Sequence, residues 1–299
     1  MTMITNTHIL TGEFDYVKTE TLDEAVALMG ELGTGARPIA GGTDLLVQMK
    51  LERQGVSVLV SLSGVSEMSG VTLDDGLWLG GTTRVQSVAE ATEIWRDFTA
   101  LAESCDGFST MPIKIMATIG GNLCNASPAA DTAPALLAFD AIVDLRSSTG
   151  ERAVPLEEFF VEPGRTELRP DEILRAVRLP RPVAETGSAF LKVARVAADI
   201  SKVSAAVRLV RDGDRVENCG IAFGSVASTP VRAHRAEQHL TGQKWSRELT
   251  EEVAGIAGEE IRPIGDVRST ETYRRHIARV IVQDALATAW LRSGGREFK

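Results

Sequence analysis

Two pairs of adjacent glycines have the types and spacing that most suggest ligand chemistry in this sequence. They lie in Ala40-Gly41-Gly42-Thr43-Asp44 and in Thr118-Ile119-Gly120-Gly121-Asn122. Glycine permits positive φ and lets a ligand approach the main chain, and successive backbone N–H groups in such a turn form an anion-binding nest. Thr43, Thr118 and Asn122 add neutral donors, and neither segment contains Lys or Arg. One pair alone indicates a tight turn, whereas two similar segments favour a shared anionic ligand such as a diphosphate.

The motifs of other nucleotide-binding and catalytic classes are missing from the sequence. It contains no G-x-x-x-x-G-K-[ST] phosphate loop, no G-x-G-x-x-G dinucleotide fingerprint and no G-x-S-x-G nucleophile turn.

Cys105, Cys124 and Cys219 are too far apart for an iron–sulfur cluster or a structural zinc, and they fit reduced thiols in the cytoplasm. His234 and His239 indicate a solvated helix face. We therefore predict no catalytic residue and no metal site in this chain.

Composition limits the expected partners and location. The 299 residues carry a formal net charge of −9, and a uniformly acidic protein repels nucleic acid. No apolar run is long enough for a membrane span, so we expect none. Residues 1–10 resemble a vector-derived tag, and the fold is predicted without them.

Residues 11–62 predict an α/β unit that presents the first glycine pair. Thr21 can cap a helix with Glu24 as its capping-box partner, and Gly33 and Gly35 would end that helix. The hydrophobic pattern predicts four elements, namely helix 21–29, strand 37–40, helix 45–51 and strand 56–62.

Residues 63–180 predict a second α+β unit around the second glycine pair. Turn sequences at 74–76 and 147–150 indicate two hairpins. The predicted elements are hairpins at 71–80 and 141–154, helices at 85–90, 94–105 and 133–139, and a strand at 172–179. This strand stops at Pro180-Arg181-Pro182, which is the best candidate for a domain boundary.

Residues 188–299 predict a third domain of the α+β class. Its strands begin at 189, 204 and 219, and a turn at Asp212-Gly213-Asp214 joins the last two. Two helices, at 232–240 and 271–291, close the chain. The pattern favours a three-stranded antiparallel sheet covered by helices.

Two segments, Ile39–Leu46 and Ala117–Asp131, resemble the FAD-binding medium subunit of the xanthine dehydrogenase and carbon monoxide dehydrogenase (molybdenum hydroxylase) family. The second, with its Ser-Pro-x-x-Asp ending, is the more specific. The resemblance implies an α+β fold, with a vanillyl-alcohol-oxidase (PCMH)-type FAD-binding domain of two α+β subdomains at 11–62 and 63–180. A C-terminal domain of the CO dehydrogenase flavoprotein type, at 188–299, would cover the flavin side.

The resemblance also implies which residues hold FAD. The two glycine segments would wrap the diphosphate from opposite sides, through Pro38, Ile39, Ala40, Gly41, Gly42, Thr43, Asp44 and Leu45, and through Ala117, Thr118, Ile119, Gly120, Gly121 and Asn122. Phe108 would pack on the cofactor, and Leu174 would lie against it. Asp131 would hydrogen-bond the cofactor at its ribose or adenine end, and Lys192 would come from the third domain.

The same resemblance places Asp199 and Ile200 beside the flavin ring. Structural interpretations of the isolated positions stay open. Phe108 and Leu174 are equally consistent with core packing, and Asp199 with a turn. Asp131 could be the N-cap of the helix at 133–139, and Lys192 could be a solvated strand residue.

The implied function is that of an FAD-binding electron-transfer subunit. A molybdopterin-containing large subunit would hydroxylate a substrate, and a [2Fe–2S] small subunit would pass electrons to FAD here, for delivery to NAD, a quinone or oxygen. The three subunits would form a heterotrimer that dimerises. The rival readings are a self-sufficient flavin oxidase or reductase of the vanillyl-alcohol-oxidase type, and a non-redox nucleotide-binding protein. An oxidase should place Tyr or His at the flavin, yet Tyr16 and Tyr273 are far from both glycine pairs in sequence.

Overall fold

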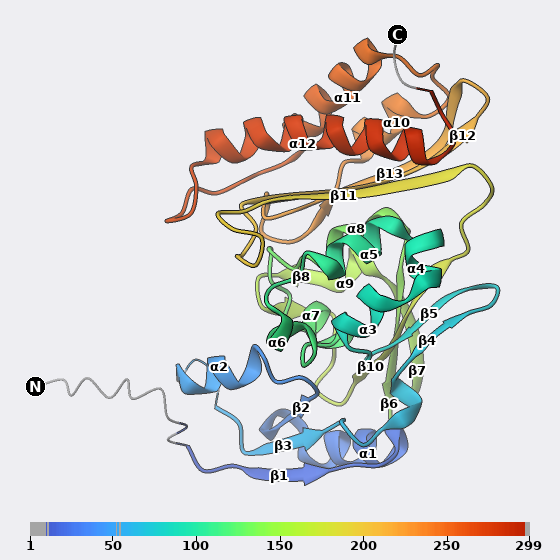
Figure 1. Cartoon of the computed structure of the whole chain (residues 1–299). Helices are drawn as coiled ribbons and strands as arrows, with labels where there is room; N and C mark the ends of the chain where they lie inside the picture. Colours follow the sequence, from blue (N-terminus) through green and yellow to red (C-terminus); the bar gives the residue numbers. More distant parts are fainter. Residues whose placement is uncertain (1–9, 11, 52, 54, 297–299) are drawn as a thin grey trace, which may run out of the picture.

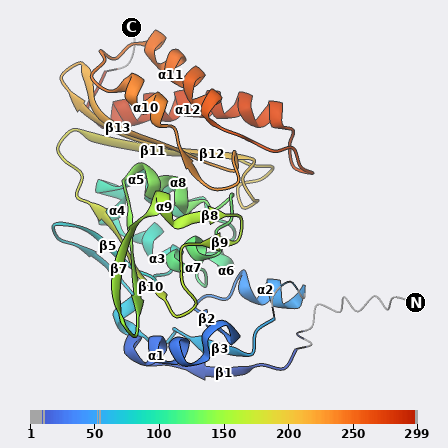
Figure 2. The same ribbon diagram turned by 180° about the vertical axis from the view of Figure 1, so that it is seen from behind.

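The chain folds into three units that follow one another along the sequence. The structure, a computed structural model, describes residue 10 and residues 12–51, 53 and 55–296. The tag expected at residues 1–10 lies outside this part, apart from Leu10. The N-terminal and C-terminal units occupy opposite ends of the molecule, with the middle unit between them (Figure 1; from behind in Figure 2). In the described part, no helix combines the length and apolar character needed to cross a membrane.

The N-terminal unit is a three-stranded parallel sheet of order β1-β3-β2. Its elements are β1 (Asp15–Lys18), α1 (Leu22–Leu32), a 3₁₀ turn (Gly33–Gly35), β2 (Ala36–Ile39), α2 (Leu45–Lys50) and β3 (Val58–Ser61). Thr21 caps α1 by accepting a hydrogen bond from the Glu24 amide, and Gly33 ends it with a φ of 55°. Strand β1 was not predicted, because an edge strand with mostly exposed residues lacks an apolar alternation.

The middle unit is built on a five-stranded sheet of order β4-β5-β10-β6-β7. Both predicted hairpins form, and β10 pairs with a strand from each of them. The sheet strands are β4 (Val71–Leu73), β5 (Gly76–Gly80), β6 (Ile142–Ser147), β7 (Gly150–Pro155) and β10 (Ile173–Pro180), and a 3₁₀ turn (Ser66–Met68) precedes them. A small separate hairpin pairs β8 (Phe160–Glu162) with β9 (Arg165–Thr166).

Short helices of the middle unit cover its sheet and carry the second glycine pair. They are α3 (Val85–Glu90), α4 (Thr92–Asp97), α5 (Thr99–Asp106), α6 (Met111–Lys114), α7 (Ile119–Cys124), α8 (Thr132–Ala138) and α9 (Leu156–Phe159). The helix predicted at 94–105 is two helices, because Phe98 interrupts it with a non-helical φ of −133° and ψ of 49°. Helix α8 is buried along its whole length and lies in the core with the sheet.

The C-terminal unit is an antiparallel sheet with three helices. Its long strands, β11 (Thr186–Val193), β12 (Val203–Asp212) and β13 (Arg215–Gly224), confirm the three predicted strands, and the two-residue β14 (Val231–Arg232) adds a fourth at the edge. The helices are α10 (His234–Leu240), α11 (Arg247–Glu260) and α12 (Glu271–Arg292). Helix α11 was missed, because half of its buried residues are alanine or glycine and give a weak apolar pattern.

Helices cover the C-terminal sheet on both faces. Helix α12 packs on one face, and α5 and α8 of the middle unit pack on the other (Figure 1). Two glycines permit this close packing. A methyl group at Gly187 would lie 2.0 Å from the carbonyl oxygen of Ala289 in α12, and one at Gly220 would lie 2.2 Å from that of Ala138 in α8. The sheet therefore contacts helix backbones directly on each side.

A charged network also joins the middle and C-terminal units. Arg208 Nη2 lies 3.1 Å from Asp140 Oδ2, and Arg232 pairs with the same carboxylate. His234 Nε2 lies 2.6 Å from Glu157 Oε1, and its Nδ1 lies 3.2 Å from Glu237 Oε2. Burial alone would lower the pKa of His234, but the hydrogen bond and charge of Glu157 outweigh it, so this pKa is raised.

The His234 contact predicts a pH-dependent contribution to stability. Because the folded-state pKa is above the ordinary value of 6.5, the contribution is complete below that pH and is lost as the pH rises through the folded-state pKa. Replacing His234→Gln should cost up to about 1 kcal/mol at about pH 5.5 and much less at about pH 8.5, since the pair is half-exposed. Urea denaturation of both proteins across this pH range measures the difference. Equal losses at both ends would contradict the assignment.

Replacing glycine by alanine should have opposite effects on stability at two positions, Gly220 in β13 and Gly255 in α11. Gly220→Ala should destabilise the chain by about 1–3 kcal/mol, because its methyl group overlaps the Ala138 carbonyl. Gly255→Ala is the matched control: it lies inside α11 with no atom near its added methyl group, and should stabilise by about 0.5–1 kcal/mol. Thermal unfolding of both variants tests this, and a neutral Gly220→Ala would refute close packing of α8 on the sheet.

Candidate functional site

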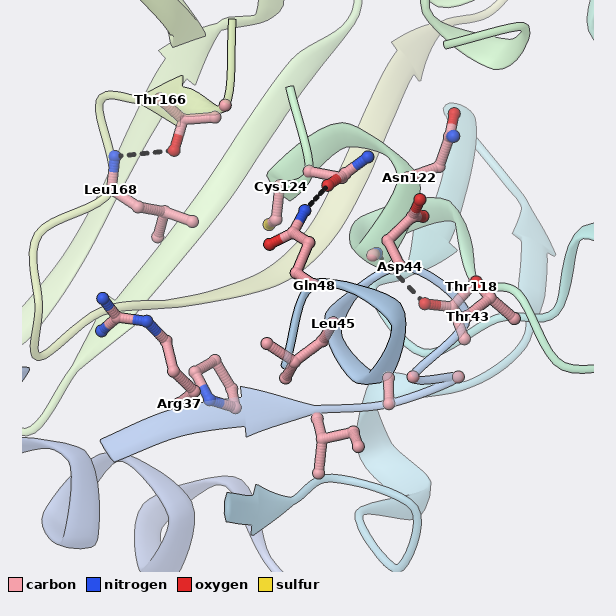
Figure 3. Close-up of a pocket in the computed structure, with 18 of the residues that line it drawn as sticks. Arg37, Thr43, Asp44, Leu45, Gln48, Thr118, Asn122, Cys124, Thr166 and Leu168 are labelled. Carbon is pink, nitrogen blue, oxygen red and sulfur yellow. Dashed lines mark hydrogen bonds between the residues drawn. The ribbon is translucent and has the colours of Figure 1, made fainter. Parts of the chain in front are cut away.

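A cavity of about 430 Å³ lies between the N-terminal and middle units. This volume is within the usual range of cofactor and small-ligand sites. Its walls come from β2 and α2 on one side, from α7 on another, and from the chain between β8 and β10 on the third. Figure 3 shows side chains from these three sources converging on one space.

The two glycine segments meet at this cavity. A methyl group at Gly41 would lie 2.1 Å from the carbonyl oxygen of Met116 and 3.0 Å from the Cα atom of Ala117. The first turn therefore packs its main chain directly on the main chain that leads into the second. Gln48 Nε2 in α2 also donates to Asn125 Oδ1 after α7, at 2.9 Å, which ties the same two walls together (Figure 3).

The first glycine turn offers a run of unused amide donors. In the hydrogen-bond network of the described residues, the N–H groups of Gly41, Gly42, Thr43 and Asp44 donate to no protein acceptor. Gly42 has a φ of 67°, a left-handed conformation that glycine adopts without strain. Consecutive free amides around such a residue, followed by the start of α2, form an anion-binding concavity.

The second glycine segment is the first turn of α7, where a loop was predicted. Thr118 caps the helix by accepting from the Gly121 amide, and the amides of Ile119 and Gly120 donate to Thr83 and Gly81. The expectation of a second set of free amides is therefore wrong, because the helix cap and a neighbouring turn already use them. The two glycine segments therefore do not offer equivalent sets of donors.

The two glycines of α7 have different roles. A methyl group at Gly120 would lie 2.5 Å from the carbonyl oxygen of Gly81, so this residue is required by packing against the protein itself. A methyl group at Gly121 would meet only the Thr118 hydroxyl, at 2.8 Å, and Gly121 lines the cavity. Gly121 therefore exposes its main chain to the cavity, and the atom nearest to an added methyl group is the end of the Thr118 side chain.

Neutral side chains complete this end of the cavity. The Thr118 hydroxyl accepts from Gly121 and can still donate its proton. Asn122 accepts from Thr132 Oγ1 at 2.6 Å through its Oδ1, which leaves the Nδ2 group as a donor. Asp44 also lies at this end and carries an acidic side chain, and burial raises the pKa of its carboxyl group. Burial also raises the pKa of the Cys124 thiol to about 12, so this cavity-lining sulfur stays protonated at neutral pH.

A buried ion pair lies between the middle and C-terminal units, beside Phe108. Lys192 Nζ in β11 lies 2.6 Å from Asp131 Oδ2 and donates to the carbonyl oxygen of Gly107 at 3.3 Å. Asp131 occupies the N-cap position of α8 but its side chain makes no capping hydrogen bond there, and the side chain of Lys192 is buried, so the interpretation of Lys192 as a solvated strand residue is wrong. Burial raises the pKa of Asp131, although Lys192 opposes the shift. Asp131 Oδ1 is buried without a hydrogen-bond partner.

The structure brings most of the predicted residues to the cavity, but not all. Those that line it are Pro38, Ile39, Ala40, Gly41, Gly42, Thr43, Asp44, Leu45, Phe108, Ala117, Thr118, Gly121 and Asn122. Ile119 and Leu174 lie in the hydrophobic core. Gly120, Asp131 and Lys192 have the protein contacts given above. Asp199 pairs with Arg195, and Ile200 is half-exposed beside it, in the β11–β12 connection.

One wall of the cavity was not predicted from the sequence. It consists of Met29 and Thr34 from the N-terminal unit, Arg37 on β2, and residues 164–166, 168–170 and Glu172 before β10. The segment at 164–172 is distant in sequence from both glycine pairs, and none of these residues belongs to a ligand motif. The available signals were the position of Arg37 just before the first glycine turn and the polar Pro-Gly-Arg-Thr stretch at 163–166.

Comparison with known proteins identifies the family of both parts of the chain. Residues 12–182 match the family described as "FAD binding domain in molybdopterin dehydrogenase", and residues 188–289 match the "CO dehydrogenase flavoprotein C-terminal domain". The xanthine dehydrogenase FAD-binding subunit of Escherichia coli O157:H7 is 30% identical, over 94% of this chain and 97% of that protein.

Solved structures give the same assignment. A carbon monoxide dehydrogenase chain from Hydrogenophaga pseudoflava superposes with a TM-score of 0.92 at 29% identity, covering 95% of this chain and 99% of that one. Quinoline 2-oxidoreductase from Pseudomonas putida 86 superposes with a TM-score of 0.88 at 25% identity, covering 94% and 98%. These matches confirm the predicted α+β fold and the predicted cofactor. The chain belongs to the FAD-binding medium subunits of the xanthine dehydrogenase and carbon monoxide dehydrogenase family of molybdenum hydroxylases.

Proposed function

We propose that this chain relays electrons inside a molybdenum hydroxylase, from a [2Fe–2S] small subunit to an external acceptor, through FAD held in the cavity. The large subunit would carry molybdopterin and hydroxylate the substrate, and the three chains would form a heterotrimer that dimerises. The observation that carries the proposal is the cavity itself, with a run of free amides on one wall and the open face of Gly121 on the other.

The residues present fit FAD on three counts. The amides of Gly41 to Asp44 offer donors that no protein group uses, as a diphosphate requires. Gly121 leaves space where phosphate oxygens would approach α7. Outside the cavity lining, against Lys192, Asp131 Oδ1 is a buried acceptor without a protein donor, and a buried polar group of this kind calls for a ligand or solvent partner. The predicted FAD contacts of the glycine segments and Phe108 remain our proposal.

In this proposal the chain holds and orients the cofactor and performs no acid–base step. Bound FAD would supply the redox chemistry, because a flavin exchanges electrons singly with iron–sulfur clusters and in pairs with acceptors. Thr118 and Asn122 would donate neutral hydrogen bonds, and Phe108 would give an apolar contact fixed by the Gly107–Lys192 bond. The acceptor would be NAD, a quinone or oxygen.

The proposed electron route predicts which partners purify with this chain and how its flavin is reduced and reoxidised. Full-length chain purified from its native host should bring two partners, one with molybdenum and one with iron and sulfide, together with stoichiometric FAD. Limited one-electron reduction of the iron–sulfur centres should then bleach the visible flavin absorbance, and one of NAD, a quinone or oxygen should restore it. If the chain turns over a substrate without partners, the self-sufficient oxidase or reductase is correct and the relay is wrong.

Replacing Gly121, the glycine that faces the cavity, should weaken FAD binding without unfolding the chain. Gly121→Val should leave the fold intact, since the Cβ atom that it adds meets only the end of the Thr118 side chain, and should raise the FAD dissociation constant at least about tenfold by displacing the diphosphate. Gly120→Ala is the control: it should lower the unfolding temperature, because its methyl group overlaps the Gly81 carbonyl. Flavin content and circular dichroism measure the two effects. Full FAD content in folded Gly121→Val would rule out the proposed diphosphate site.

A further inference from the structure

A tight turn before α12 presents an apolar side chain fully to solvent. Within the connection from α11 to α12, the Asp266 amide donates to the Ser269 carbonyl oxygen at 3.0 Å, and the Ser269 amide donates to that of Asp266 at 3.3 Å. Val267 and Arg268 form the tip of this turn, and Val267 is 100% exposed. Single exposed apolar side chains are common, so the surroundings of the tip decide whether it has a function.

Hydrogen bonds to one carboxylate fix the shape of this turn. Asp266 Oδ1 accepts from the amides of Arg268 and Ser269, at 2.9 and 3.1 Å. The same oxygen accepts from Arg274 Nη2 at 2.8 Å. Arg274 is itself buried, and its Nη1 donates to two backbone carbonyl oxygens at 3.1 and 2.7 Å. The tip therefore has a fixed shape in the free chain, and a preorganised contact loses little entropy when a partner binds.

Further exposed apolar side chains surround the tip. Ile264 is 69% exposed, and Tyr273 in the first turn of α12 is half-exposed. The β11–β12 connection lies beside them, because Lys202 Nζ is 5.6 Å from the centre of the Tyr273 ring, and this connection adds the exposed Val196. Both segments lie on the same side of the molecule, at the left in Figure 1 and at the right in Figure 2. We call residues 195–202 and 262–273 together the α12-entry surface.

The α12-entry surface carries an excess of positive charge. Its acidic side chains are Asp199, Asp266 and Glu271, and each of them already pairs with an arginine. Among the described residues Lys202 has no acidic partner, and the exposed guanidinium group of Arg262 donates only to backbone carbonyl oxygens. An apolar tip with cations around it is therefore exposed on a chain whose net charge is −9. A complementary surface would be acidic around an apolar pocket.

We propose that the α12-entry surface docks a different polypeptide of the native complex, through an acidic surface whose apolar pocket receives Val267. The inference rests on the proposed function, which supplies the partner subunits. Charge selects the occupant, because a second copy docked symmetrically through the same surface would bring like charges together. A partner with acidic side chains would instead neutralise Lys202 and Arg262, which no acidic group of this chain neutralises.

Substitutions of opposite charge at the tip test both the contact and the sign of the partner's charge. Val267→Asp and Val267→Lys both remove the apolar contact, so each should raise the dissociation constant of this chain from the native complex, Val267→Asp at least about tenfold. At low salt Val267→Asp should be at least about threefold worse than Val267→Lys, because an acidic partner repels the carboxylate. At about 1 M salt, where screening is strong, the difference should shrink. Dissociation on dilution, followed by sedimentation, measures these constants.

Two other exposed side chains provide matched controls. Val183→Asp makes the same change in the β10–β11 connection, and Arg247→Gln removes an exposed cation of α11. Both should leave the dissociation constant unchanged, whereas Arg268→Gln at the tip should raise it about threefold at low salt. All of these variants should keep their FAD content and unfolding temperature, since the bonds that shape the turn come from Asp266 and the backbone.

A benzophenone amino acid incorporated at position 267 identifies what covers the tip in the assembled complex. It should cross-link to another polypeptide, at a segment that contains Asp or Glu. Cross-linking only to a second copy of this chain would overturn the inference, as would a Val267→Lys variant that binds worse than Val267→Asp. A complex insensitive to both substitutions removes this inference alone. A chain that purifies without partners removes the proposed function together with it.

Discussion

Contact between two stretches of main chain, at Gly41 and at Met116–Ala117, is the constraint on which the cavity depends. A side chain at Gly41 would separate the N-terminal unit from the segment that enters α7, because even a methyl group would overlap the Met116 carbonyl. The Gln48–Asn125 hydrogen bond holds the same walls a few residues further on. With the walls in place, the free amides of one turn and the open face of Gly121 share one space.

The second constraint couples the cavity to the C-terminal unit. Lys192 and Asp131 are both buried, and removing one partner of such a pair typically costs about 3–5 kcal/mol because the other charge is left uncompensated. Such a pair adds little net stability, and the two bonds of Lys192 link β11 to Asp131 and to the Gly107 carbonyl. Through Gly107 it holds the main chain before Phe108, so docking of the C-terminal sheet and the shape of the cavity depend on each other.

The cavity divides its electrostatics between two kinds of donor. At the glycine turns the donors are neutral amides, a hydroxyl and a carboxamide, which favour an anion through fixed dipoles. At the other end Arg37 and Arg169 supply full charges from segments that no glycine motif marks. Sequence analysis expected dipoles alone, because neither glycine segment contains Lys or Arg. The arginines reach the cavity only because β2 and the chain before β10 both form its walls in the folded protein.

The sequence by itself determined the features that depend on neighbouring residues. The cap of α1 at Thr21, the two hairpins of the middle sheet and both glycine pairs are local patterns, and each was predicted. Only the tertiary structure decided that the second pair begins a helix with its amides already bonded, and that Gly120 meets Gly81 while Gly121 faces the cavity. It alone also decided that Arg37 and Arg169 share one wall. The physical reason is that a local sequence pattern determines the conformation of its own segment. Which residues of other segments that segment contacts depends on how segments distant in the sequence pack together.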